Sequence, residues 1–350
     1  MRLSLYAWEF LREFEKQKTI ELDDLIQVYR EHWRDESWHE VLGLMAGMVD
    51  AKFTGEVLEY LIGENGEAEK FSNLFLAAEC VSEVKNRNES AAIARNLRER
   101  LKELTRYGNI TNFTPSEYDN LVYQIHRQAV AAVAETWKDD PETLPILKQR
   151  AQSDDDSAVR RAAVQELARG WKDDPETLPI LKQRAQSDDD LKVRRAAVQE
   201  IARGWKDDPE TLPILKQRAQ SDDDWNVRYA AVQEIARGWK DDPETLPWLK
   251  QRAQSDDDWN VRGAAVQEIA RGWKDEPGIF ELLCDVSINH PFAREYDLQD
   301  NPRQIALTAM IELYPDRPET LELVRDRAQN DSDERLRKFA QKNLAKLEPQ

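Results

Sequence analysis

The pattern of apolar and polar positions repeats with a fixed period through the middle of the chain. Tryptophan recurs every 34 residues, and the sequence between successive tryptophans is copied almost letter for letter. A period in this length range is typical of a solenoid in which each unit stacks only on its neighbours. The near-identical units span residues 137–170, 171–204, 205–238 and 239–272, and the tryptophans are Trp137, Trp171, Trp205, Trp239 and Trp273.

Each unit is predicted to hold two helices separated by an acidic loop. The apolar residues of both halves recur at spacings of three and four, which places them on one face of a helix. The run Ser153–Asp156 interrupts the pattern and breaks the first helix. The buried stripes are Leu144, Leu147 and Ala151 in the first helix and Val159, Ala163 and Leu167 in the second.

The ends of these helices are predicted from residue types that favour caps. Asp140 is expected to cap the first helix with Pro141 at its first position, and Thr143 is an alternative cap. The acidic loop supplies the amino-terminal cap of the second helix. Gly170 is expected to end the second helix in the left-handed conformation.

The second helix of each unit resembles that of a HEAT repeat. The phrase Asp156–Ala163 followed by Leu167 carries the Asp, Val-Arg, Ala-Ala and Leu positions of that family. The resemblance implies an all-α, right-handed α-solenoid of HEAT-like helical hairpins over residues 109–350. Degenerate units are expected before and after the four copies: one through Ile125-His126-Arg127, one from Trp273 lengthened by a loop at His290–Tyr296, and one from Tyr314 to the end.

Residues 1–108 lack the period but keep helical spacing of their apolar positions. Three amphipathic stripes are predicted, and turns at Gly63–Gly66 and Tyr107–Asn109 separate helices. We interpret this region as an irregular helical cap on the solenoid. The stripes run through Trp38, Val41, Leu42, Met45 and Met48-Val49, then Phe53, Val57-Leu58 and Leu61-Ile62, then Phe71, Leu74-Phe75 and Ala78.

The phrases Tyr6–Phe10 and Glu31–Leu42, followed by Leu44–Met48, resemble a particular junction. They are similar to the helical segment that follows the NACHT NTPase module in bacterial NLR-like (STAND) signal-transduction ATPases. The resemblance implies an attached nucleotide switch, with the repeat array as its sensor. No GxxxxGK[ST] motif occurs, and no glycine is followed by lysine, so this chain is expected to be the carboxyl-terminal part of such a protein and not to hydrolyse ATP.

The four copies differ at only five of their 34 columns, and four of these differences are radical. Position 161 lies about 200° around the helix from Val159, so it points away from the core, and position 157 shares its face. In HEAT-like solenoids the second helix lines the concave side. The candidate binding residues are Ser157, Leu191, Trp225 and Trp259 in one column, Lys192, Asn226 and Asn260 in the next, Arg161, Arg195, Tyr229 and Gly263 in a third, and Trp248 on the first helix.

The residue types in these columns favour binding over drift. Neutral drift after duplication explains variation at solvent-facing sites without any ligand, yet it seldom places large aromatic residues in water, whereas interfaces favour them. Gly263 fits an exposed site, because glycine inside a helix costs about 1 kcal/mol relative to alanine. The constant tryptophans 137, 171, 205, 239 and 273 lie at turns between units, where a packing role is expected.

Composition narrows the classes of function. The chain carries 50 Lys and Arg against 68 Asp and Glu, a net charge of −18. This acidic balance argues against nucleic-acid binding, which requires a basic surface. No apolar run is long enough to cross a membrane, and the amino end does not read as a signal peptide. Two cysteines, Cys80 and Cys284, make no disulfide framework, so a cytoplasmic setting is expected.

Other candidate chemistry is declined. The Asp154–Asp156 loops are oxygen-rich, but they lack the glycine and glutamate of an EF-hand, so caps explain them better than calcium. The histidines show no zinc spacing, and His126, in a column otherwise held by arginine, is interpreted as a surface residue. Both cysteines are expected to be buried and inert. The Arg160 and Arg169 columns are expected to pair with Glu166 and with the aspartates of neighbouring units.

The sequence therefore predicts a non-enzymatic scaffold with no cofactor and no metal, which binds a protein or peptide in its concave groove. The sensor arm of a NACHT-type ATPase in bacterial defence or stress signalling is the role that the resemblance implies. Two alternatives remain: an enzyme of the bilin-lyase type, which also uses short HEAT-like units, and a purely structural or oligomerisation scaffold.

Overall fold

The structure is a computed structural model that describes residues 9–10, 12, 21–84, 90–108, 115–295 and 299–347, with the backbone alone at 115–120. In these residues every regular element is helical, and the predicted all-α solenoid of helical hairpins is confirmed. The chain forms two compact units, Met1–Ile180 and Leu181–Gln350, which meet within α10 (Thr177–Ser187). The predicted boundary between cap and solenoid, at Asn109–Thr114, lies outside the described residues.

In the first unit, the helices between Leu22 and Thr136 pack around one apolar core. Most of the predicted stripes are buried, as Leu42, Leu58 and Leu74 show with exposed fractions of 0–1%, but Met48 of the first stripe is 46% exposed. The Tyr29 hydroxyl donates to the Leu42 carbonyl at 2.6 Å inside this core. The helices are α2 (Leu22–His32), α3 (His39–Met48), α4 (Ala51–Gly63), α5 (Ser72–Glu83), α6 (Ala91–Leu104), α7 (Pro115–Thr136), α8 (Thr143–Ser153) and α9 (Ser157–Gly170).

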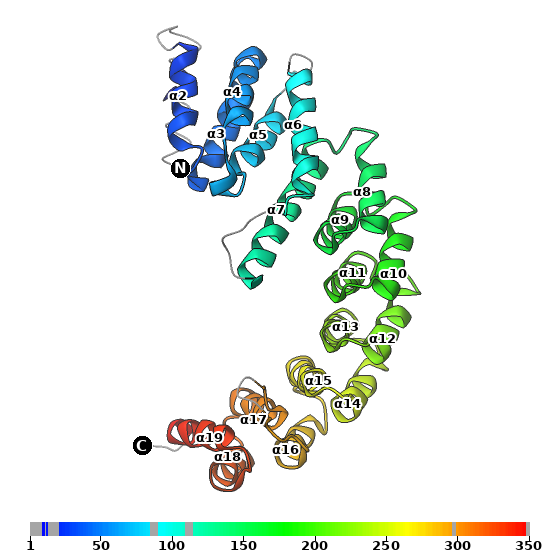
Figure 1. Ribbon diagram of the computed structural model, residues 1–350. Coiled ribbons are helices and arrows are strands. Elements are labelled where there is room, and N and C mark those ends of the chain that lie inside the picture. Colours follow the sequence, from blue (N-terminus) through cyan, green and yellow to red (C-terminus); the bar gives the residue numbers. More distant parts are fainter. Residues whose placement is uncertain are drawn as a thin grey trace. The chain divides into compact units, whose positions relative to one another are not determined.

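The second unit is a series of helical pairs in which like helices stack. The second helix of each pair packs on that of the next, as α11 on α13, α13 on α15 and α15 on α17. Within this unit these second helices follow the inner side of a curve, and α12, α14 and α16 follow its outer side (Figure 1). The helices are α11 (Leu191–Gly204), α12 (Thr211–Ser221), α13 (Trp225–Gly238), α14 (Thr245–Ser255), α15 (Trp259–Gly272), α16 (Ile279–Asn289), α17 (Pro302–Leu313), α18 (Pro318–Asn330) and α19 (Glu334–Leu347).

The core and the cap of the second helix are as the repeat predicts. Val159, Ala163 and Leu167 are completely buried. The Asp156 carboxylate accepts a hydrogen bond from the Ala158 N–H at 2.7 Å, which satisfies one of the free donors at the start of α9. The acidic loop therefore acts as a helix cap.

The predicted cap of the first helix is wrong. α8 begins at Thr143, so Asp140 and Pro141 lie in the turn before the helix. The Asp140 carboxylate accepts from the Glu142 N–H at 2.9 Å, and the Thr143 hydroxyl donates to the Trp137 carbonyl at 2.7 Å. These side chains shape the turn between units, and neither caps α8.

The predicted end of the second helix is also wrong in detail. Gly170 is the last helical residue and is not left-handed; among the described glycines only Gly278 has a positive φ, of 81°. Trp171 follows with φ −133° and ψ 40°, and its N–H donates to the Leu167 carbonyl at 3.0 Å. The chain leaves the helix through a residue that is neither helical nor left-handed, so no glycine conformation is needed there.

Arginines in the second helices join successive repeats. Arg194 donates through Nη1 to the carbonyls of Asp188 and Asp189, at 2.9 and 3.3 Å, in the loop of its own repeat. Its Nε and Nη2 atoms donate to the Asp222 carboxylate of the next repeat at 3.0 and 2.9 Å. Asp222 is 4% exposed, so the fork of the guanidinium satisfies a buried charge. The same bridge joins Arg228 to Asp256 and Arg303 to Asp331.

Two further rows of ion pairs run along the repeats. The second of them confirms that the arginines of the Arg169 column form ion pairs, as predicted. Lys182 contacts Asp208 at 3.2 Å and Glu210 at 2.7 Å, in the turn that follows Trp205. At the carboxyl ends of the second helices, arginine pairs with glutamate of an adjacent second helix. These pairs are Arg169–Glu135 at 2.7 Å in the first unit, and Arg203–Glu234 at 2.8 Å and Arg237–Glu268 at 2.7 Å in the second.

Among the described residues, no helix combines the length and the apolar character that crossing a bilayer requires.

Substitution of Arg228 by Met removes the partner of a buried carboxylate and is expected to destabilise the chain by about 3–5 kcal/mol. The matched control is Lys338→Met, because the Lys338–Glu334 pair is exposed and such pairs contribute about 0–1 kcal/mol. Urea unfolding followed by circular dichroism measures both. Equal shifts in the two midpoints would contradict the bridging role of Arg228.

Candidate functional site

Most of the side chains that differ between the copies lie on the second helices of the repeats, and most of them reach the surface. Trp225 is 36% exposed, whereas Val227, two residues further on α13, is completely buried. Lys192 and Arg195 on α11 are exposed. The partly exposed members are Ser157, Arg161, Leu191, Asn226, Tyr229, Trp259 and Asn260.

An aromatic pair occupies this face of α13. The rings of Trp225 and Tyr229 meet edge to face, with 6.3 Å between their centroids. The Gln233 amide donates to the Tyr229 hydroxyl at 3.1 Å. Because the three residues are four apart, they share one face of α13, and the contacts fix the orientation of an exposed indole.

The next inner helix presents its tryptophan against a loop. Trp259 meets Phe292 edge to face, with 5.9 Å between centroids. Phe292 is 6% exposed and belongs to the long loop between α16 and α17. Arg303 donates to the carbonyls of His290 and Phe292, both at 2.9 Å, which holds the loop in place. The lengthened unit therefore builds one wall beside Trp259.

His290 stands where the other repeats have the first aspartate of the acidic loop. The Arg262 Nε donates to His290 Nε2 at 2.9 Å. A guanidinium only donates, so this nitrogen carries a lone pair and the imidazole is neutral. Burial, together with the charges of Arg262 and Arg303, lowers the pKa of His290 to about 4. Between these two repeats, the arginine therefore binds a neutral imidazole in place of a carboxylate.

Two of the candidate residues are buried, which corrects the expectation that they project into solvent. Trp248 is 8% exposed on α14, a helix of the outer row. Ile180, the equivalent residue two repeats earlier, is 4% exposed. Trp248 is therefore a packed residue of the outer row, and its indole does not add to the inner face.

Gly263 is buried for a different reason. A Cβ atom built there lies 2.7 Å from Ile305 Cδ1 of α17. Aligning Arg262 with Arg303 places Ile305 where the earlier repeats have alanine, as at Ala264. The larger residue on α17 is accommodated by the smallest one on α15. The glycine therefore reflects close packing of two helices and not tolerance at an exposed position.

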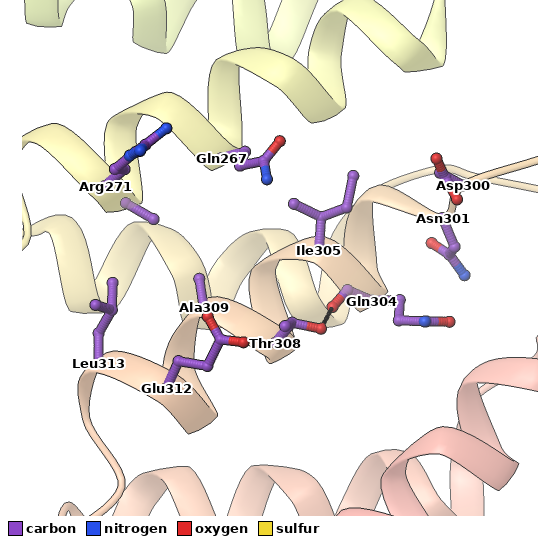
Figure 2. Close-up of a pocket in the computed structure, with 11 residues that line it drawn as sticks. Gln267, Arg271, Asp300, Asn301, Gln304, Ile305, Thr308, Ala309, Glu312 and Leu313 are labelled. Atoms are coloured by element: carbon purple, nitrogen blue, oxygen red, sulfur yellow. Dashed lines mark hydrogen bonds between the residues drawn. The ribbon is translucent and has the colours of Figure 1, made fainter. Parts of the chain in front are cut away.

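A groove of about 380 Å³ lies between α15 and α17 on the inner row. Figure 2 shows Gln267 and Arg271 on α15 above it and Ile305, Gln304 and Glu312 on α17 below. The differences between the four copies do not indicate this groove, because half of it belongs to the degenerate unit. The signal was present as departures of residues 300–313 from the repeat. The remaining lining residues are Ala270, Asp300, Asn301, Thr308, Ala309 and Leu313.

The constant tryptophans occupy the turns between repeats. Each follows the last residue of a second helix, and its N–H donates to the carbonyl four residues earlier, as Trp205 does to Ile201 at 3.0 Å. Trp273 is 8% exposed and the other four are partly exposed. This position supports a structural role.

Other candidate chemistry remains weak. In the described part of the chain, no group of His, Cys, Asp and Glu is arranged to hold a metal ion. His126 is 1% exposed, so its interpretation as a surface residue is wrong; it lies 2.8 Å from the Tyr107 carbonyl and 3.3 Å from the Asp156 carboxylate. Cys80 is buried as expected, whereas Cys284 is partly exposed.

A family model described as HEAT repeats matches residues 123–202 and 188–270. The match covers the near-identical units except for the last two residues of the fourth, and it confirms that they are HEAT repeats, a class of helical repeat that commonly mediates protein binding. The repeats thus indicate a protein-interaction scaffold. The comparison with curated proteins finds no match.

Substituting Gly263 by Tyr, the residue of the preceding unit, is expected to destabilise the chain by about 1–3 kcal/mol, because the ring competes with Ile305 for the same space. Adding Ile305→Ala recovers part of this loss. Urea unfolding of both single variants and the double variant gives the coupling free energy. Additive effects would show that Gly263 and Ile305 do not contact.

Stability should depend on pH through His290. Its pKa is lower in the folded chain than in the unfolded chain, so its contribution is complete above about pH 6.5 and is lost as pH falls towards 4. His290→Asp replaces it with a carboxylate, as in the other repeats. The stability of this variant relative to wild type is expected to rise by about 3 kcal/mol from pH 6.5 to 4. A constant difference between the two unfolding curves would contradict the neutral imidazole.

Proposed function

We propose that the chain is a non-enzymatic recognition scaffold that binds a protein or peptide partner on the inner face of its second helices. The observation that carries the proposal is Trp225, an indole that is 36% exposed and oriented by Tyr229. Large aromatic side chains supply much of the binding free energy at protein interfaces. The columns that hold these residues are also those in which otherwise identical repeats differ.

The repeats combine a constant framework with a variable surface. The arginine bridges and the apolar stripes are the same from copy to copy, so they set the spacing of the inner helices. The residues in the three variable columns of the second helix, which begin at Ser157, Ala158 and Arg161 in the first unit, do not affect that spacing. One partner can then contact aromatic side chains on two adjacent helices, the pair Trp225 and Tyr229 on α13 and Trp259 on α15. Solenoids use such extended surfaces for binding.

The finer assignment follows from the resemblance of residues 1–108 to the segment after a NACHT module. We propose that the array is the sensor arm of a cytoplasmic NACHT-type ATPase in bacterial defence or stress signalling. A partner that favours one curvature of the array would shift the population of the attached switch. Addition of the partner should then change nucleotide turnover when this chain is joined to such a module, and unchanged turnover with saturating partner would refute the coupling.

Affinity capture from host lysate tests the binding face. The variant Trp225→Ala/Tyr229→Ala/Trp259→Ala is expected to lose a partner that wild type recovers, by at least tenfold in quantitative mass spectrometry, since loss of such anchors weakens binding by about 2 kcal/mol or more. The matched control is Gln183→Ala/Gln217→Ala/Gln251→Ala, three exposed positions on the first helices.

Circular dichroism of both triple variants establishes that they remain folded. Recovery of the same partners by wild type and the aromatic variant would remove the support for the inner face. Light scattering separates the structural alternative, because an oligomerisation scaffold would form defined assemblies that the aromatic variant retains.

A further inference from the structure

Arginines stand in a row at the carboxyl ends of the inner helices, and one of them pairs with no carboxylate among the residues that the structure describes. Arg203 pairs with Glu234 at 2.8 Å, and Arg237 pairs with Glu268 at 2.7 Å. In both pairs the glutamate belongs to the second helix of the next repeat and is nearly buried. Arg271 is the next member of this row, on α15.

Alanine stands where the partner of Arg271 should be. Arg262 and Arg303 are equivalent, because both donate to the carbonyls of the loop before their own helix. The same register aligns Trp273 with Tyr314, and it aligns Glu268 with Ala309. Arg271 is exposed and takes part in no ion pair with the described residues of the chain. Its guanidinium therefore reaches the groove without the acceptor that Arg203 and Arg237 have.

The loss of this glutamate also opens the space. Ala309 is part of the groove between α15 and α17, where Ala270, Ile305 and Leu313 supply further apolar surface. Gln267 and Gln304 add amide groups on either side (Figure 2). A volume of about 380 Å³ is at the small end of ligand sites, so it suits a few side chains of a peptide.

The charges of the groove select what enters. Arg271 is its only cation among the described lining residues, and the Arg237–Glu268 pair shows how an arginine at this column takes a carboxylate at 2.7 Å. Glu312 and Asp300 also line the groove and disfavour a segment with many acidic residues. The complementary ligand has a single acidic side chain beside an apolar one.

We infer that the groove between α15 and α17 binds an extended segment of a partner protein, whose acidic side chain pairs with Arg271 and whose neighbouring aliphatic side chain packs on Ile305 and Ala309. The carboxylate of the partner takes the place of the missing glutamate of the row. This assignment rests on the proposed function, since it names one subsite of the inner face and the chemistry of its occupant.

Panning of the whole chain against a phage-displayed library of random twelve-residue peptides tests the inference. Enriched peptides are expected to share one Asp or Glu next to Leu, Ile, Val or Met. A fluorescent synthetic copy of the best peptide then measures affinity by anisotropy. Arg271→Gln is expected to weaken binding at least tenfold, and Ala309→Glu to abolish it, because the new glutamate pairs with Arg271 and fills the groove.

The controls separate folding from binding. Arg203→Gln breaks an equivalent pair away from the groove and is expected to change affinity less than twofold. Ala309→Glu completes the row, so its melting temperature should equal or exceed that of wild type, which excludes misfolding as the cause of lost binding.

Several results would overturn the inference. These are a failure to enrich any peptide, enrichment of basic peptides, or affinity that neither Arg271→Gln nor Ala309→Glu changes. If Trp225→Ala abolishes peptide binding while Ala309→Glu does not, the inner face remains the binding surface and this subsite is wrong. A dimer that Ala309→Glu converts to monomer would assign the groove to a second copy of the chain, and would equally overturn it.

Discussion

The bridge from one arginine to two acidic loops is the interaction on which the repeat array depends. A single HEAT unit exposes apolar surface on both sides and is stable only when stacked. The guanidinium of Arg194 binds the loop carbonyls of its own repeat and the Asp222 carboxylate of the next, so it fixes both the distance and the orientation between successive inner helices. Bidentate geometry makes this contact specific, which a lysine would not achieve.

This constraint separates the residues that hold the array from those that are free to change. Most positions of each second helix are the same in every copy, among them the core valines and the bridging arginine, and so is the aspartate that caps the helix. The face opposite the core takes no part in these contacts, so serine, leucine and tryptophan are all accommodated at its first position. The candidate binding surface therefore lies where side chains take no part in the core, the caps or the arginine bridges.

The rows of contacts are interrupted at the unit that follows the four copies. His290 replaces an aspartate in the bridging row, and Ala309 replaces a glutamate in the second row. The loop that carries His290 brings Phe292 against Trp259, and the missing glutamate leaves a groove beside Arg271. The aromatic surface, the groove and the guanidinium of Arg271 thus lie at neighbouring positions on α15 and α17.

The sequence predicts features that depend on one helix and fails where two helices meet. Periodicity identifies Val159, Ala163 and Leu167 as core, and residue type identifies Asp156 as a cap, because these follow from local geometry. Trp248 and Gly263 are expected in solvent but are buried, and Gly263 is buried because Ile305 of another helix approaches it. His126 was misread similarly, because its burial depends on distant Tyr107. The repeat pattern does not single out Arg271, because what distinguishes this arginine is the alanine that replaces glutamate at position 309, 38 residues later.

Amide hydrogen exchange of the chain with and without its captured partner tests the central claim most directly. Binding on the inner face is expected to slow exchange in α13, α15 and α17 and to leave exchange in α12, α14 and α16 unchanged. Protection confined to the outer helices α12, α14 and α16 would contradict it.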